Sequence, residues 1–373
     1  MPVWVTSTPV VTSIAARRLR AQHLTGKPFA SPVEAVRALT AVQSQDFGAG
    51  KWALGLRTRG VTRARSVTEE TIDRLFDEGA ILRTHVLRPT WHFVLPEDIH
   101  WMLMLTGPRI TRSLAGRHRE LELDAKVIAR AGAAFTAALA GGHSLTRQEL
   151  GSVLRKARIS PEGQRLPHLL SHAELDRLIT SGPRRGKLHT YALLEERAPK
   201  ARRLERAEAV AELTLRYFRS HGPAQLQDFT WWSGLTLGDA RRGIAAAGTA
   251  LEHQAIEGKE YWFDAKAGHA HDASGGAHLL PNFDEYTVAY RDRTEVMHAG
   301  RLHEPAFALS NVVLVDGRIR GSWRRKVGRN GVSVEVRALD RFDPADTAAL
   351  EAAGRRFGAY LERPVHLSVL STV

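Results

Sequence analysis

The sequence contains no cysteine among its 373 residues. This absence excludes disulfide bonds, thiol nucleophiles and cysteine-ligated zinc. No run approaches the roughly 20 apolar residues that a membrane-spanning helix requires. Near the N-terminus the basic cluster follows the short apolar run, which is the reverse of the order in a secretory signal. We therefore expect a cytoplasmic protein.

Several common cofactor and hydrolase motifs are also missing. There is no G-x-x-x-x-G-K-[ST], no strand-linked G-x-G-x-x-G and no G-x-S-x-G. His269, His271, Asp272 and His278 lie in or beside a glycine-alanine loop, without the spacing of four residues that a zinc-binding helix shows. The sequence therefore predicts neither a metal nor a cofactor.

Acidic residues are fewer than basic ones, 40 against 53, so the formal net charge is +13. Such an excess favours a polyanionic partner, and nucleic acid is the commonest. The basic side chains gather in clusters, whereas a solvated surface usually mixes both signs. The candidate DNA contacts are Arg57 and Arg59, with Arg63 and Arg65 nearby; Arg184, Arg185 and Lys187; and Arg318, Arg320, Arg324, Arg325, Lys326 and Arg329.

The hydrophobic periodicity predicts helices over residues 13–24 and 32–42, followed by a break at Gly48 and Gly50. A further helix is expected between an N-cap at Thr68 and a stop at Gly79. Residues 80–95 are rich in β-branched and aromatic side chains, which predicts paired strands.

The next two segments repeat one order, three helices followed by a β-hairpin, which are the parts of a winged helix. The first segment resembles a less regular version of the same order of elements. The predicted fold is α+β and helix-rich, with three tandem winged-helix modules over residues 1–125, 126–200 and 201–275. Residues 276–373 are expected to form a C-terminal β-hairpin or barrel-like element with a closing helix. Its hairpin is predicted at Asp316-Gly317, which suits a type I′ turn.

Gln43-Ser44-Gln45 stands between the second predicted helix and the glycine-rich break. Residues two apart share a side on extended backbone but not on a helix. If the helix has ended there, both amides point into one pocket and can hold a water or a base edge. The alternative is two solvated glutamines at a frayed helix end.

Three stretches resemble the winged-helix DNA-binding family that contains the AlkZ-like and YcaQ-like DNA glycosylases. They are AVQSQDFGAGKWALGLRTR, LRPTWHFVLPEDIHWMLMLTGPRI and LLPNFDEYTVAYRDR, and the resemblance runs from about Thr12 to the C-terminus. It implies removal of bulky or crosslinked N7-alkylated purines, in DNA repair or in self-resistance to an alkylating antibiotic. The family's catalytic motif, Gln-aliphatic-Gln or Gln-aliphatic-Asp, maps onto Gln43 and Gln45 and departs from the pattern at Ser44.

A cationic N7-alkylpurine leaves without being protonated, so amide oxygens that place water and steady an oxocarbenium-like sugar could suffice. Asp46, beside the pair, and His92 are secondary catalytic candidates; the alternative for His92 is a satisfied core histidine. Asp284 and Glu285 are expected to have a structural, capping role, and a contribution to the catalytic cleft is kept as the alternative.

The leading hypothesis is a monomeric, monofunctional DNA glycosylase acting on double-stranded DNA and associated with the nucleoid. The alternatives are a winged-helix DNA-binding protein without activity, such as a transcriptional regulator, and a protein that sequesters a DNA-reactive drug.

A crosslinked base cannot flip freely, which implies an open cleft. The Asp316-Gly317 hairpin is a candidate groove probe, and the turn at Arg184–Lys187 a candidate phosphate contact. Trp52, Trp231 and Trp232 could stack on bases but are expected in the core.

Overall fold

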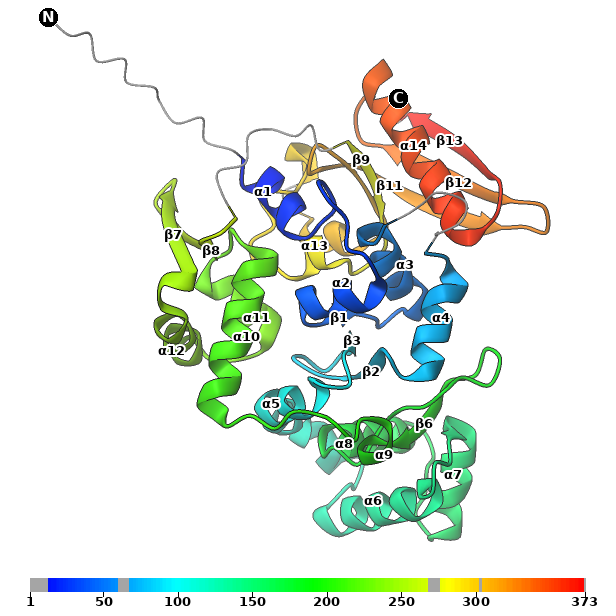
Figure 1. Ribbon diagram of the computed structural model, residues 1–373. Helices are drawn as coiled ribbons and strands as arrows, with labels where there is room; N and C mark the ends of the chain where they lie inside the picture. Colours follow the sequence, from blue (N-terminus) through cyan, green and yellow to red (C-terminus); the bar gives the residue numbers. More distant parts are fainter. Residues whose placement is uncertain (1–12, 60–66, 268–275, 302–303, 372–373) are drawn as a thin grey trace, which may run out of the picture.

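The computed structural model describes residues 13–59, 67–267, 276–301 and 304–371 (Figure 1). The fold is mixed α+β and rich in helix, as predicted. Within the described ranges, no helix is both long enough and apolar enough to cross a membrane.

The N-terminal unit places a small sheet among helices. After α1 (Ile14–Ala21), its elements are α2 (Pro32–Leu39), β1 (Val42–Gln43), α3 (Phe47–Arg57), α4 (Glu69–Glu78), β2 (Leu82–His85) and β3 (Trp91–Val94). The three strands pair antiparallel in the order β1-β3-β2. Thr68 caps α4 and Gly79 ends it in the left-handed conformation, which confirms both helix signals.

The predicted break at the glycine-rich segment is wrong in one respect. The helix before the glutamines ends early, at Leu39, and Gly48 and Gly50 lie inside the next helix, α3. Gly50 is there because the chain packs tightly: a Cβ would lie 2.9 Å from both Phe93 Cε2 and Ser44 Cβ. The extended segment is therefore short, and Asp46 begins α3 as its N-cap.

Two further units repeat the element order of α2 to β3. One consists of α6 (Ala125–Leu139), β4 (Leu145–Thr146), α7 (Arg147–Lys156), α8 (Arg165–Leu175), β5 (Ile179–Ser181) and β6 (Thr190–Leu193), followed by α9 (Leu194–Arg197). The other consists of α10 (Arg206–His221), α11 (Leu226–Ser233), α12 (Leu237–Ala247), β7 (Leu251–Ile256) and β8 (Lys259–Asp264), with a bridge from Ala224 to Trp262 in place of the first strand. Capping boxes begin α7 at Thr146 and α12 at Thr236.

The long helix α5 (Ile99–Glu120) joins the first unit to the second and was not predicted from the sequence. It contains Pro108, and an internal proline is normally a sign against a continuous helix.

The C-terminal unit is an open sheet covered by a helix. Its elements are β9 (Ala277–Leu280), α13 (Glu285–Val288), β10 (Val312–Val315), β11 (Arg318–Val327), β12 (Val332–Ala338), α14 (Pro344–Leu361) and β13 (Val365–Ser371). The strands follow the order β13-β12-β11-β10-β9, with β13 and β9 at the two edges. The expected barrel-like element is therefore wrong, because the described edge strands do not pair with each other. Asp316 and Gly317 both have positive φ, as a type I′ turn requires.

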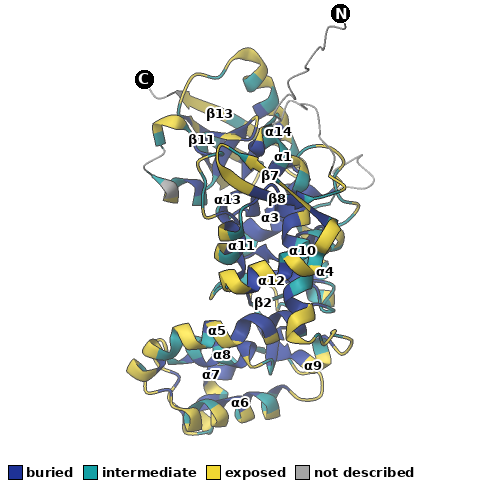
Figure 2. Ribbon diagram, turned by 90° about the vertical axis from the view of Figure 1, so that its left-hand side faces the viewer, coloured by how far each residue is buried: buried dark blue, intermediate teal, exposed yellow. Residues whose placement is uncertain are grey.

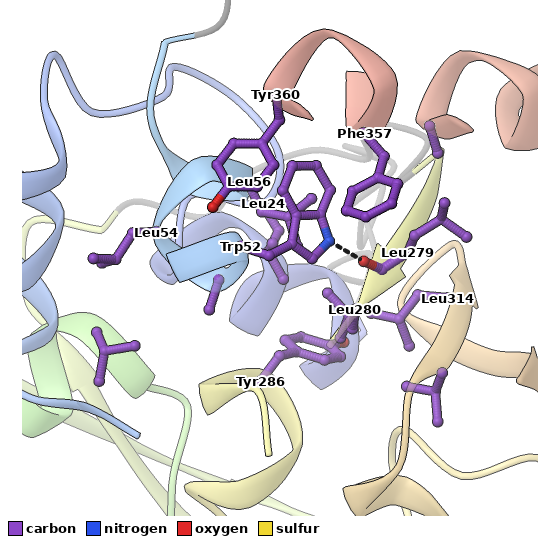
Figure 3. Packing of buried hydrophobic residues seen from close by; sticks show 14 of the residues in the cluster. Leu24, Trp52, Leu54, Leu56, Leu279, Leu280, Tyr286, Leu314, Phe357 and Tyr360 are labelled. Atoms are coloured by element: carbon purple, nitrogen blue, oxygen red, sulfur yellow. Dashed lines mark hydrogen bonds between the residues drawn. The ribbon is translucent and has the colours of Figure 1, made fainter. Parts of the chain in front are cut away.

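The first and last units share one hydrophobic core. Trp52 of α3 packs between Phe357 and Tyr360 of α14, and its indole Nε1 donates a 2.7 Å hydrogen bond to the carbonyl of Leu279 (Figure 3). The α6–α8 unit lies at one end of the elongated molecule and the C-terminal sheet at the other (Figure 2). The strands β1 to β3 therefore lie near the middle, between α10–α12 and α4 (Figure 1).

Candidate active site at the start of strand β3

Gln43 lies in strand β1 and Gln45 in the bend that follows it, and both side chains reach the start of β3. The Gln43 amide donates from Nε2 to the Thr90 hydroxyl at 3.4 Å, and Gln45 Oε1 accepts from the Trp91 N–H at 3.2 Å. The side chain of Gln43 is buried, whereas Gln45 is exposed. The two amides thus bond to successive residues, Thr90 and Trp91, Gln43 from a buried position and Gln45 from an exposed one.

The carbonyl oxygen of the Gln43 side chain, Oε1, is buried and has no hydrogen-bond partner among the described residues. A buried acceptor of this kind is costly unless something donates to it. Gln43 therefore carries a buried acceptor that the described residues leave unsatisfied.

Ser44, between the two glutamines, is fully buried. Its Cβ faces the position of Gly50, and its hydroxyl has no partner in the described part of the chain. The residue at which the sequence departs from the expected motif is therefore an interior one.

Arg83, which was not among the predicted site residues, holds the backbone of the glutamine segment. Its guanidinium donates to the Ser44 carbonyl at 2.8 Å and to the Gln45 carbonyl at 3.2 Å, and it stacks over Trp91 with 4.4 Å from Cζ to the ring centroid. Burial lowers the pKa of Arg83 to about 10, so the side chain stays charged at neutral pH. An arginine within a predicted strand gives, by itself, no signal in the sequence for this role.

His92 lies directly opposite Gln43 in the β1–β3 pair, so the two side chains share a face of the sheet. Its Nδ1 lies 2.9 Å from the Thr90 carbonyl, which can only accept, so Nδ1 carries the proton. Nε2 is then an acceptor, buried and without a partner among the described residues. Burial and the charge of Arg88 lower the pKa of His92 to about 4, so the ring is neutral at physiological pH.

The carboxylate of Glu285 binds the backbone of β1 at the edge that does not pair with β3. Its Oε1 accepts the Gln43 N–H at 2.8 Å, and its Oε2 accepts the Trp232 indole N–H at 3.0 Å. His221 Nε2 lies 3.5 Å from the same carboxylate. Burial alone would raise the pKa of Glu285, but His221 and the Gln43 N–H bring it below its ordinary value. The buried carboxylate thus stays ionised and fixes the Gln43 backbone.

Asp46 is exposed, and its Oδ1 accepts the Ala49 N–H at 3.0 Å as the N-cap of α3. Asp284 is fully buried and binds both guanidinium nitrogens of Arg57, at 2.7 and 2.8 Å. Arg57 is therefore engaged in the interior and is removed from the candidate DNA contacts. Arg59 is exposed, and Arg63 and Arg65 lie outside the described residues.

The turn at 184–187 is only partly free. Arg184 binds Asp73 and Asp77 of α4, at 2.9 and 2.8 Å, so it docks the second unit onto the first. Arg185 is exposed and pairs with Glu149, whereas Lys187 is exposed with no ion pair among the described residues.

The Asp316-Gly317 turn does not project as a groove probe. The Gly317 carbonyl accepts from the Tyr286 hydroxyl at 2.8 Å, and a Cβ at Gly317 would lie 3.2 Å from Ala15 and Leu19 of α1. Arg318 beside it is exposed, and Arg320 pairs with Asp340 and Asp346.

At the opposite end of β11 the basic side chains are exposed. Arg324, Arg325, Lys326 and Arg329 are all exposed there. Arg324 pairs with Glu335, while Arg325 and Lys326 have no ion pair within the described ranges. A Cβ on Gly48 would lie 3.5 Å from Arg325 Nη2, so this guanidinium reaches the first turn of α3. The β11–β12 tip thus borders the segment that carries the two glutamines.

No group of three candidate ligands among the described residues could hold a metal ion. His278 is buried on β9, and His269, His271 and Asp272 lie outside the described part of the chain.

Comparison with known proteins gives two matches. The model of a family described as DNA glycosylase AlkZ-like matches residues 36–360. The solved structure of Streptomyces sahachiroi DNA glycosylase AlkZ aligns with a TM-score of 0.77 at 19% sequence identity, covering 95% of this chain and 98% of that one. A search of curated protein sequences finds no match.

Proposed function

Because the chain belongs to the AlkZ-like family of DNA glycosylases, we propose that it hydrolyses the N-glycosidic bond of N7-alkylated, cationic purines in DNA. The proposal extends to bulky adducts and interstrand crosslinks, in DNA repair or in self-resistance to an alkylating agent. It requires no cofactor, because an alkylated purine with its own positive charge is a good leaving group.

One observation carries the proposal: Gln43 and Gln45 converge on residues 90 and 91. The free Oε1 of Gln43 and the unprotonated Nε2 of His92 are both acceptors, suited to orient a water toward the sugar. Neutral amide dipoles can also stabilise positive charge that develops on the sugar ring. His92, neutral at physiological pH, would serve as a positioning group and not as an acid.

We further propose that the three units with the repeated element order are winged helices within residues 1–125, 126–200 and 201–275, and that 276–373 form the C-terminal element. Three such modules in one chain can grip a duplex without a partner subunit, so the proposed active form is a monomer. The proposed DNA surface comprises the exposed cations Arg59, Arg185, Lys187, Arg318, Arg324, Arg325 and Lys326. Such contacts set position and affinity without reading sequence.

The first test replaces the amides without emptying their space. Gln43→Met and Gln45→Met keep side-chain length but remove the amide groups, so water is no longer oriented. We expect the double variant to release N7-methylguanine from duplex DNA at least about 100-fold more slowly, as loss of a catalytic positioning or electrostatic group does. Single-turnover base release measures this rate.

Gln148→Met, at an exposed position of α7, is the matched control and should release base at the parent rate. Duplex affinity should stay within about twofold in all variants, because neither glutamine belongs to the cationic surface. A parent protein that leaves methylated, bulky and crosslinked purines intact at enzyme excess would contradict the proposed substrate class. A double variant with the parent rate would remove the glutamines from catalysis.

A further inference from the structure

The three tryptophans that were considered for base stacking have different environments. Trp52 and Trp232 are fully buried, whereas Trp231, on the same helix as Trp232, is 42% exposed. The Trp231 indole donates from Nε1 to the Val288 carbonyl at 3.0 Å, which holds the ring in one orientation. An exposed, oriented indole is the kind of surface on which nucleobases stack.

Two arginines flank this ring. The Cζ of Arg88 lies 5.8 Å from the ring centroid of Trp231, and that of Arg293 lies 5.5 Å from it. Arg88 Nε and Nη2 and Arg293 Nη2 are buried and have no hydrogen-bond partner among the described residues. The two guanidinium groups therefore act on the Trp231 ring through their charge, over the ring, and not through exposed donors.

The cluster is held rigidly beside the two glutamines. Trp232, the next residue, donates to the Glu285 carboxylate that also accepts the Gln43 N–H. Gly234 ends α11 against the turn before β3, where a Cβ would lie 2.5 Å from the Leu87 carbonyl. Arg88 follows Leu87 in that turn, which continues to the start of β3, where the glutamine amides converge.

We propose that the exposed ring of Trp231, with Arg88 and Arg293 close to it, is a stacking site for a planar ring of the DNA substrate beside the site of base excision. The ring is a neutral one, because two guanidinium groups repel the cationic lesion itself. It is either an unstacked base near the lesion or the aromatic part of a bulky adduct. This assignment rests on the proposed function for its biological role, but ring stacking itself can be measured without base excision.

The experiment measures affinity and fluorescence with undamaged DNA first. Trp231→Ala should weaken binding to a duplex with one unpaired purine by about 5- to 150-fold, the range for loss of one base–aromatic stack. Trp231→Phe keeps a smaller ring and should lose less. Binding should quench the tryptophan emission of the parent protein, and Trp231→Phe should remove most of that quenching. Trp262→Phe, at a partly exposed tryptophan on β8, should leave both affinity and quenching unchanged.

A second arm uses a fully paired duplex that carries a bulky aromatic adduct. A penalty for Trp231→Ala on the unpaired-purine duplex identifies a base as the stacked ring, and a penalty only on the adduct duplex identifies the adduct. Parent-like affinity and quenching of both Trp231 variants on both duplexes would overturn the proposal. Trp231→Phe keeps the test decisive if Trp231→Ala fails to fold. Base release is measured separately, so an inactive parent enzyme would contradict the proposed function without touching this result.

Discussion

At the scale of single residues, the site depends on groups that are kept neutral or kept charged by their surroundings. His92 is fully buried and neutral, while Glu285 is fully buried and ionised. Both contact Gln43, one across the strand pair and one at the strand edge. The environment of the catalytic candidate is therefore set by neighbours from distant parts of the chain.

The lowered pKa of His92 predicts that stability falls in mild acid. Below about pH 6.5 the unfolded chain gains a proton on this histidine, and the folded chain does not until about pH 4. Stability therefore decreases as pH falls through this window. Between pH 7 and pH 5 we expect the parent protein to lose about 2 kcal/mol more than His92→Asn.

Urea unfolding at the two pH values measures this difference. His189, whose pKa burial also lowers to about 4, contributes equally to both proteins and cancels in the comparison. Equal pH dependence of the two proteins would mean that His92 is not held neutral.

At the scale of elements, the start of α3 offers a matched pair of glycines. Alanine at Gly50 would place a Cβ 2.9 Å from Phe93 and from Ser44, and 3.1 Å from the Gln43 carbonyl. We expect Gly50→Ala to cost about 1–3 kcal/mol through overpacking and to slow base release by displacing β1. Gly48→Ala meets nothing closer than 3.5 Å and should raise stability by up to about 1 kcal/mol, because alanine favours the helix.

Thermal unfolding and single-turnover base release of the two variants check this prediction. If Gly50→Ala matches the parent in both measurements, β1 is not held by this close approach.

The two ends of β11 are expected to differ in their contribution to DNA binding. Arg325 and Lys326 lie at the free tip beside α3, while Arg318 lies beside the turn that packs on α1. Replacing Arg325 and Lys326 by alanine should weaken binding uniformly across sequences. It should also reduce the slope of log affinity against log salt by about 2, one for each lost phosphate contact.

Fluorescence anisotropy at several salt concentrations measures the slope. Arg318→Ala removes an equally exposed charge from the same strand and should change the slope less. A larger effect of Arg318→Ala would place the duplex at the other end of the sheet.

At the scale of the whole molecule, buried ion pairs join units that are far apart in sequence. Arg57 of α3 and Asp284 are both fully buried, and Gln22 after α1 accepts a 2.8 Å hydrogen bond from the same guanidinium. Arg18 and Asp228 form a second buried pair, 3.6 Å apart, between α1 and α11. The first, third and C-terminal units are therefore expected to unfold together.

Breaking the Arg57–Asp284 pair should destabilise the whole molecule. Asp284→Ala leaves a buried guanidinium without its partner, so we expect a loss of about 3–5 kcal/mol. Arg324→Ala breaks an exposed pair with Glu335 and should cost less than about 1 kcal/mol. Denaturant unfolding followed by circular dichroism checks both values; a small effect of Asp284→Ala would contradict a shared, buried connection.

Local patterns sufficed for many elements. The cap at Thr68, the helix stop at Gly79 and the turn at Asp316-Gly317 were all predicted, because each depends on residues within one turn. Helix α5 was not predicted, since its internal proline argues against a helix locally while its apolar face is stabilised by distant packing. Gln43 was predicted on extended backbone and lies in strand β1, but the helix before it ends at Leu39 and not at the glycines, and Gln45 lies in a bend.

The pattern of residues was enough to predict the mixed, helix-rich fold, the excess of positive charge and the pair of glutamines as the candidate site. The tertiary structure then shows which cations remain free: Arg57 and Arg184 are neutralised by carboxylates, whereas Arg325 and Lys326 stay exposed. It alone revealed Arg83 and Glu285 as the groups that hold the glutamine backbone. The reason is physical: a local pattern records the propensity of a residue and its neighbours, but burial and charge pairing depend on residues that only folding brings together.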